Sequence, residues 1–391
     1  MRFKYINIVY FLVVCFFSSC IKPFDYQNVE YEKSVVVDGL ITNEKKEHLV
    51  KLGYSSPINL SDNIPLTGAS VWIDVSDGST ISFFEVEPGN YKTAADVACI
   101  PGYSYTLNFN LPNGETYKST VEKFNAPIPI DSIYIRYAEL PTETSGFNEP
   151  GIQFFIDSHD ESYNSKYFRY EWEATYLIKT PLTSYYDFDF GTNTFFPRTT
   201  YVSTCYASDY NSSLIIGNSL DNEFGRIAEL PIHFASGESY KLKHRYSLFV
   251  KQFSISQEAF SFYKKIKESN ESGGFLFDKQ LGSITGNIRN PKAPSESVLG
   301  FFEVASVSET RRFFNHTDFN KFIAPPPFKF YCNFQEIIET TDDSISYYMN
   351  NYNSLRIVST SSYGTPAQLW SRECTDCSWY ASTIKPAFWI D

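Results

Sequence analysis

Six short runs rich in apolar and aromatic residues, separated by turn residues, constrain the fold of this chain most strongly. They span residues 34–40, 48–54, 69–75, 81–86, 103–111 and 116–121. Within the third run, Val71, Ile73 and Val75 alternate with other residues, as in a strand with one buried face. Hairpin signals lie at Asp77-Gly78, Pro88-Gly89-Asn90 and Pro112-Asn113-Gly114. The spacing predicts a small antiparallel β-sandwich domain over residues 34–126.

The phrase from Pro65 to Val71, followed by Gly89-Asn90-Tyr91, resembles the transthyretin-like and carboxypeptidase-regulatory-like β domains of exported proteins. The resemblance implies an Ig-like or transthyretin-like sandwich that acts as a scaffold. Pro127 and Pro129 then form a stiff junction, because proline fixes φ and cannot donate to a strand ladder.

A second, larger domain is predicted over residues 130–391. Longer β runs cover 132–137, 151–157, 167–179, 226–233 and 240–255, and a helix is expected to begin after Ser256, a favourable N-cap residue. Residues 180–198 are rich in Tyr, Asp and Phe without periodicity, which indicates an exposed loop. The expected fold class is therefore mainly β: the N-terminal sandwich, then a larger antiparallel β-rich domain with one or two helices.

The N-terminus has the pattern of an export signal. Arg2 and Lys4 precede an apolar run from Ile6 to Phe17. The run is shorter than the roughly 20 apolar residues of a membrane-spanning helix, and polar residues follow at once. Residues 1–19 are therefore predicted to be a signal peptide.

The sequence Phe17-Ser18-Ser19-Cys20 resembles a bacterial lipobox. Cys15 is the alternative acceptor, but the branched Val14 precedes it where a small residue is preferred. We expect acylation of Cys20, insertion of its acyl chains into membrane lipid, and a tether over residues 20–33. The alternative is a soluble secreted protein in which this cysteine occurs by chance.

Once Cys15 is removed and Cys20 acylated, five thiols remain: Cys99, Cys205, Cys332, Cys374 and Cys377. Outside the cytoplasm cysteines form disulfides. An odd number leaves one unpaired, most simply Cys99, and the other four allow three pairings. The Cys374-Thr375-Asp376-Cys377 motif could be redox-active, zinc-binding or structural. Neither a βαβ pattern nor a second ligand pair accompanies it, so disulfides to distant partners such as Cys205 or Cys332 are expected.

Charge and motifs argue against several function classes. The net charge is −12, and −14 without the two basic residues of the signal, which disfavours a nucleic-acid partner. Nucleophile-elbow, zincin and P-loop patterns are absent from the sequence, and the histidines do not have ligand spacing. We therefore expect no catalytic residues, no metal and no cofactor.

Asp187 and Asp189 lie next to Tyr185 and Tyr186 within the predicted loop. Exposed aromatic rings beside carboxylates can stack on and hydrogen-bond a sugar or a peptide, so these four residues are candidates for contacts with a peptide or glycan ligand. The alternative is a loop that packs on its own domain or on a partner subunit.

Several short motifs in a fixed order resemble the Bacteroidetes lipoproteins called domain-of-unknown-function 4249. They are Val37-Asp38-Gly39, Asp131-Ser132-Ile133, Gly286-Asn287-Ile288, Val298-Leu299-Gly300-Phe301-Phe302, Pro366-Ala367-Gln368-Leu369-Trp370, Cys374-Thr375-Asp376-Cys377 and Lys385-Pro386-Ala387-Phe388-Trp389. This chain lacks the Gly-Gly-Thr common after the second cysteine, which affects local loop geometry. The resemblance implies an outer-membrane lipoprotein docked on a β-barrel partner, without established catalytic residues.

From this resemblance we expect a non-enzymatic accessory or binding subunit of a TonB-dependent transporter complex. The alternatives are a structural subunit of a secretion or outer-membrane insertion assembly, and an extracellular enzyme acting on glycans or peptides. A surface-exposed position is favoured over the periplasmic face. Ser132 and Ser344 each lie in a tripeptide that fits the O-glycosylation acceptor pattern of this phylum.

Overall fold

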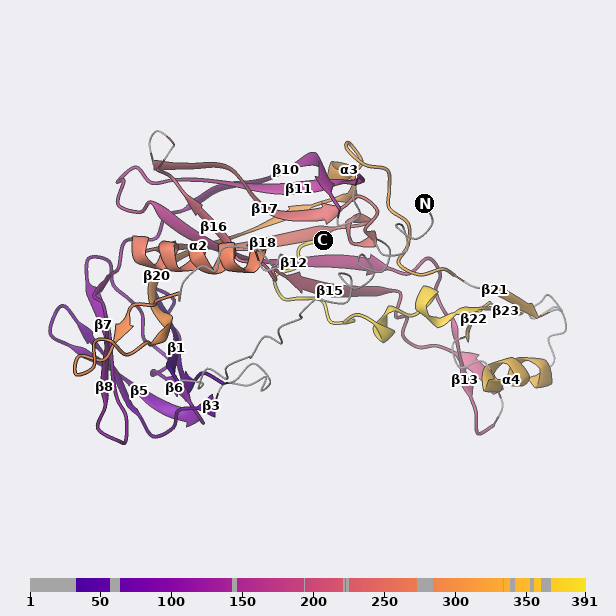
Figure 1. The fold of residues 1–391 in the computed structure, drawn as a ribbon. Helices are drawn as coiled ribbons and strands as arrows, with labels where there is room; N and C mark the ends of the chain where they lie inside the picture. Colours follow the sequence, from indigo (N-terminus) through magenta and orange to yellow (C-terminus); the bar gives the residue numbers. More distant parts are fainter. Residues whose placement is uncertain are drawn as a thin grey trace, which may run out of the picture.

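Figure 1 shows three regions: an N-terminal sandwich, a larger body, and an arm that projects from the body. The structure is a computed structural model that describes residues 33–56, 64–142, 146–192, 194–220, 222, 225–272, 284–332, 334–337, 342–351, 355–359 and 367–391. The predicted signal peptide, Cys20 and most of the predicted tether lie outside the described residues. Within the described part of the chain, no helix combines the length and apolar character needed to cross a membrane.

The predicted N-terminal runs all form strands. The six runs correspond to β1 (Val35–Thr42), β2 (Leu49–Tyr54), β4 (Ser70–Val75), β5 (Thr80–Glu87), β7 (Ser104–Asn110) and β8 (Thr116–Ser119). Three short strands outside the predicted runs are β3 (Ile64–Pro65), β6 (Asn90–Lys92) and β9 (Glu122–Lys123). Val71, Ile73 and Val75 are buried, as their alternation predicts. A β-rich fold is therefore confirmed, whereas the transthyretin-like subtype stays a prediction.

Strand β1 joins the sandwich to the body. It pairs antiparallel with β2 and, on its other edge, parallel with β20 (Leu299–Phe314). The short strand β19 (Ile288–Arg289) also pairs with β8. Ile288, Phe302 and Val304 consequently lie in the same apolar core as Val37 and Val71. The sandwich assigned from the sequence to residues 34–126 therefore includes a segment from beyond residue 287.

The body consists of two sheets that share an apolar core. One continues from β20 through β18 and β12 to β15, with β16 also paired to β12, and the other has the order β10-β11-β17. The bounds are β10 (Ile130–Pro141), β11 (Asn148–His159), β12 (Tyr167–Lys179), β15 (Thr204–Tyr210), β16 (Ile215–Asn218), β17 (Arg226–Ser236), η2 (Tyr240–Leu242), β18 (Tyr246–Ile255) and α3 (His316–Phe319).

The expected helix is α2 (Gln257–Ser272), and its N-terminus is capped as predicted. The hydroxyl of Ser256 accepts a hydrogen bond from the backbone N–H of Ala259 at 3.1 Å. The apolar side of α2 packs on β18 and β20, where Ala259 is buried against a separate cluster that includes Phe253 and Phe301. The helix thus covers the sheet face opposite the shared core.

The arm contains two small sheets and one helix, and it corrects one prediction. Its elements are β13 (Tyr186–Asp189), β14 (Thr194–Pro197), β21 (Phe334–Ile337), α4 (Asp342–Asn351), β22 (Leu355–Ser359) and β23 (Ala367–Ser371). Residues 180–198, expected as an irregular exposed loop, include the β13–β14 hairpin. The hairpin is ordered because Phe188 packs into a cluster with Met349, Ile357 and Leu369. These partners come from a segment that is distant in sequence, so local periodicity did not reveal them.

An ion pair between the sandwich and the body gives a pH-dependent prediction. Glu44, just after β1, accepts hydrogen bonds from Lys251 of β18 at 2.5 Å and from Lys46 at 2.6 Å. Burial alone would raise the pKa of Glu44, but the two lysines outweigh it and lower the pKa to about 2. A carboxylate with a lowered pKa stabilises the folded state above its unfolded pKa, and this contribution is lost as the pH falls through the folded pKa.

We therefore expect Glu44→Gln to lower the free energy of unfolding at pH 6. The difference in free energy of unfolding between the variant and the wild type should become smaller below about pH 4.5 and disappear near pH 2. Urea unfolding of both proteins across this pH range measures this difference. Glu47→Gln is the control, because Glu47 pairs with Lys92 with half of its side chain exposed and should contribute little. A difference that persists unchanged at pH 2 would contradict the prediction.

Candidate ligand-binding site

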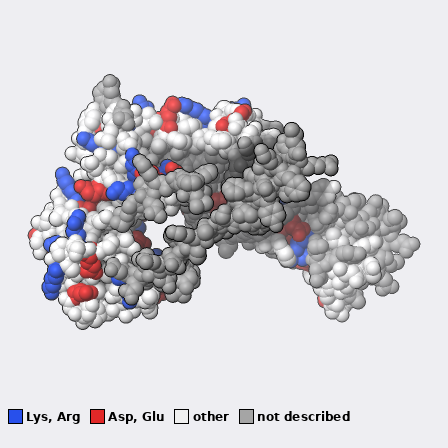
Figure 2. Space-filling view, in the orientation of Figure 1, with Lys and Arg blue, Asp and Glu red and all other residues white. Residues whose placement is uncertain are grey.

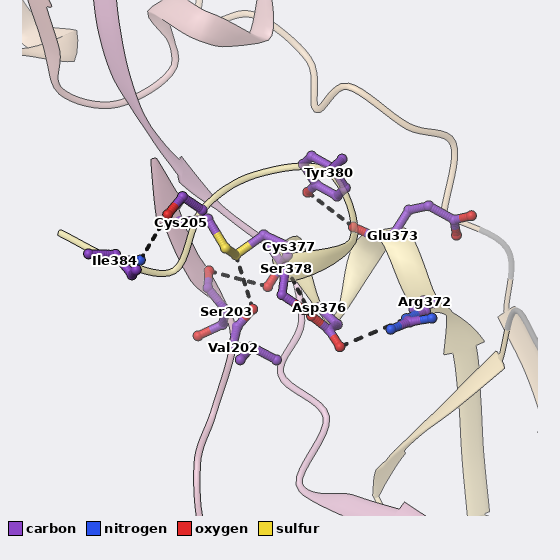
Figure 3. Close-up of a disulfide and its surroundings, with 12 residues drawn as sticks. Val202, Ser203, Cys205, Arg372, Glu373, Asp376, Cys377, Ser378, Tyr380 and Ile384 are labelled. Carbon is purple, nitrogen blue, oxygen red and sulfur yellow. Dashed lines mark hydrogen bonds and ion pairs between the residues drawn. A yellow bond between two sulfur atoms is a disulfide. The ribbon is translucent and has the colours of Figure 1, made fainter. Parts of the chain in front are cut away.

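Two disulfides hold the C-terminal segment between the body and the arm. Cys377 is bonded to Cys205 of β15 (Figure 3). Cys374 is bonded to Cys332. Each cysteine of the close pair therefore reaches a distant partner, and all four candidates are in disulfides. Cys99 is buried and has a free thiol.

Backbone hydrogen bonds fix the same segment. The N–H of Cys377 donates to the carbonyl of Val202 at 3.0 Å, and the N–H of Leu182 donates to the carbonyl of Cys374 at 3.1 Å. The segment forms two short turns, η3 (Arg372–Cys374) and η4 (Cys377–Trp379). Between them the Asp376 carboxylate accepts a hydrogen bond from the N–H of Ser378 at 3.0 Å, which caps the second turn. The side chains of both turns are thus held in defined positions.

These turns form one wall of a cavity of about 670 Å³, and the arm forms the rest. The lining residues come from the β13–β14 hairpin and the residue after it, from α4 and β22, and from the two turns: Tyr186, Asp187, Phe188, Phe190, Arg198, Met349, Arg356, Arg372, Glu373 and Trp379. Figure 2 shows that charged side chains on this face of the molecule gather on the sandwich, on the body and at the base of the arm. The volume is in the range of small-molecule sites.

Three arginines give the cavity its chemistry. Arg198 donates to Asp187 at 2.8 Å and lies 4.0 Å from Asp376. Arg372 approaches the same oxygen of the Asp376 carboxylate at 3.9 Å. The Asp376 side chain is 6 % exposed, so water competes little with these two guanidinium groups.

The third arginine, Arg356, is also close to these charges. Its Nη1 donates to the backbone carbonyl of Leu355 at 2.6 Å. Burial lowers the pKa of Arg356, and the positive charges of Arg372 and Arg198 lower it further. The carboxylates of Asp376 and Asp187 act on this pKa in the opposite direction, so the three guanidinium groups and the two carboxylates form one electrostatically coupled cluster.

The remaining walls are aromatic and apolar. Phe188 and Met349 are buried in the arm core, whereas Phe190 and Trp379 expose 54 % and 60 % of their surface. The Arg372 guanidinium lies over the Trp379 ring at 4.2 Å from its centre. The cavity therefore places flat exposed rings beside a cluster of cations.

The structure separates the four predicted ligand-contact residues into two pairs. Tyr186 and Asp187 line the cavity. Tyr185 instead packs edge-to-face with Tyr201 at 5.4 Å, and Asp189 accepts a hydrogen bond from the N–H of Gly191 at 2.8 Å. The three arginines and Trp379 were not predicted from the sequence. The one available signal was that Arg372 and Trp379 flank the pair Cys374 and Cys377.

Burial of the free thiol gives a second prediction. Burial raises the pKa of Cys99 to about 12, so its thiol is protonated and unreactive at neutral pH. We expect no reaction of the folded mature protein with Ellman's reagent, and one thiol per chain after unfolding without reductant. Cys99→Ala, the control, should give none. More than one thiol in the unfolded wild type would contradict either the two disulfides or the acylation of Cys20.

The described residues contain no group of three or more His, Cys, Asp or Glu side chains placed to hold a metal ion. No curated protein matches this sequence. Among solved structures, a DUF4785 family protein from Legionella pneumophila aligns with 10 % identity over 56 % of this chain and 51 % of that chain, with a TM-score of 0.18. This chain thus spans about half the length of that protein.

A family model described as "Domain of unknown function (DUF4249)" matches residues 21–311. The match includes the sandwich, most of the body and the cavity residues Tyr186, Asp187 and Arg198, and it ends before Arg356 and Arg372. Because it spans more than half of the chain, the protein belongs to the DUF4249 family.

Proposed function

We propose that this protein is a non-enzymatic binding subunit, anchored at the outer membrane through acylated Cys20 and exposed at the cell surface. In this role it works beside a TonB-dependent β-barrel transporter and presents a ligand to it. The observation that carries the binding role is the cavity of about 670 Å³ with three arginines and exposed aromatic rings. The membrane anchor and the barrel partner rest on the sequence pattern around Cys20 and on the family resemblance.

The rigidity of the cavity supports a binding role. Two disulfides and the backbone hydrogen bonds of Cys377 and Leu182 hold its wall before any ligand arrives. A preformed site loses less conformational entropy on binding than a mobile one, so more of the contact energy remains as affinity. The buried Asp376 carboxylate also keeps two arginines in place.

Affinity purification of the full chain from its native host in mild detergent tests the proposed setting. Recovery of a TonB-dependent barrel supports the proposal. Recovery of secretion or insertion machinery would favour a structural subunit instead, and a protein without a partner that hydrolyses glycan or peptide polymers would favour an enzyme.

The anchor is tested separately by Cys20→Ser. We expect this variant to leave the membrane fraction, because the acyl chains supply the attachment. Cys99→Ala is the control and should stay membrane-bound. A Cys20→Ser protein that remains with the membrane would overturn the proposed anchor.

A further inference from the structure

We propose that the cavity binds an organic anion in which one carboxylate or phosphate group is attached to a flat apolar ring. This inference rests on the proposed binding role and names the ligand class. The acidic group would lie among Arg198, Arg356 and Arg372, and the ring would lie against Trp379 and Phe190.

Charged groups of the cavity lining suit an anion. Arg198 donates to Asp187 at 2.8 Å, whereas Arg198 and Arg372 lie 4.0 Å and 3.9 Å from Asp376, beyond hydrogen-bond distance. Figure 3 shows the Glu373 side chain pointing away from Arg372 and Asp376. The cavity lining thus carries three guanidinium groups together with the carboxylates of Asp187 and Glu373, and the guanidinium N–H groups are donors that suit an anion.

Two arginines of the cavity lining have unused hydrogen-bond donors. The Nε atoms of Arg198 and Arg372 are buried, and neither has a hydrogen-bond partner among the described atoms. Buried N–H groups are almost always paired in native structures, so each such group needs an explanation. The oxygens of a carboxylate or phosphate are acceptors that suit guanidinium donors, and they form shorter and stronger hydrogen bonds than neutral acceptors do.

Two exposed rings of the cavity lining favour a ligand that carries a ring. Trp379 and Phe190 are more than half exposed, although both line the cavity. Arg372 already stacks on the Trp379 ring, which aligns a flat apolar surface with the cationic end of the site. A bare anion would leave these rings in contact with water, whereas an anion that carries a ring would cover them.

Fluorescence titration and calorimetry on the full mature chain test this inference with defined probes. Phenyl phosphate and benzoate combine a ring with an anion, inorganic phosphate is the anion without a ring, and benzyl alcohol is the ring without an anion. We expect phenyl phosphate or benzoate to bind at least about tenfold more tightly than inorganic phosphate and benzyl alcohol. Tighter binding of phenyl phosphate would indicate a phosphate ligand, and tighter binding of benzoate would indicate a carboxylate ligand.

Variants locate the binding. Arg356→Gln is expected to weaken the binding of the ring-bearing anion about tenfold, because it removes one cation of the cluster. Arg226→Gln is the matched control, since Arg226 is 57 % exposed and does not line the cavity. Trp379→Phe should remove most of the fluorescence change while binding remains measurable by calorimetry. The melting temperature of each variant verifies that it is folded.

Three results would overturn the inference: equal affinity for inorganic phosphate, equal affinity for benzyl alcohol, or unchanged affinity in Arg356→Gln. Lack of binding by all four probes would overturn it as well. These results are independent of the affinity purification. A barrel partner recovered without anion binding would reject only the ligand class, and anion binding without a barrel partner would reject only the proposed setting.

Discussion

Replacing Gly300 with alanine should cause the largest loss of stability of any single change considered for this protein. Gly300 has φ +89°, in the left-handed region that L-residues rarely adopt, and a Cβ atom there would lie 1.9 Å from the carbonyl oxygen of Val37. These two residues are partners in the parallel pairing of β1 with β20. The added methyl would therefore push apart the strands that join the sandwich to the body.

Gly102→Ala separates the two causes. Gly102 has φ +90°, but nothing lies within 4 Å of the Cβ position. In Gly102→Ala the free energy of unfolding should fall only by the cost of backbone strain, of order 1–3 kcal/mol. In Gly300→Ala it should fall by this amount and by the steric cost as well, so we expect a much lower urea midpoint or no folded protein. Equal losses in the two variants would show that β1 and β20 adjust without cost.

Replacing Glu303 with alanine should cause the second large loss. The Glu303 side chain is 2 % exposed and accepts hydrogen bonds from Arg169 at 3.1 Å and from the hydroxyl of Tyr263. These groups join β20, β12 and α2. In Glu303→Ala the buried Arg169 charge has no buried carboxylate beside it. Removal of one member of a buried ion pair lowers the free energy of unfolding by about 3–5 kcal/mol.

The second carboxylate beside Arg169 provides the control. Glu171 also pairs with Arg169, at 2.5 Å, but 47 % of its side chain is exposed. We expect Glu171→Ala to cost less than about 1 kcal/mol, because water replaces much of the lost interaction. Chemical unfolding followed by tryptophan fluorescence measures both variants. If Glu171→Ala were as destabilising as Glu303→Ala, burial would not determine the strength of this network.

The strands of the sandwich could be predicted because each has its own alternation and its own turn residues. Val71, Ile73 and Val75 are buried as the pattern indicates. The joint between β1 and β20 could not be predicted, since it pairs residue 37 with residue 300 and no local signal specifies a distant parallel partner. The β13–β14 hairpin was missed for the same reason, because its core partners lie beyond residue 340.

The candidate site was only partly predictable. The combination of aromatic and acidic residues around Tyr186 and Asp187 correctly drew attention to the hairpin, and both residues line the cavity. Arg198, Arg356 and Arg372 come from separate segments, and only the folded chain with its disulfides brings them together. An isolated arginine in a sequence is most often a solvated surface residue, so spacing alone could not single these out.

The disulfide pattern has a consequence for biosynthesis. Ribosomes make the chain from its N-terminus, so of the four cysteines in the disulfides Cys205 and Cys332 emerge first, although they are not native partners. Cys205 must wait for Cys377, 172 residues later, whereas Cys332 emerges sooner and is already available to it. A premature bond between these two would have to be exchanged through a mixed disulfide before the cavity wall could close. We therefore expect correct assembly of this protein to need an environment that reshuffles disulfides as well as forming them.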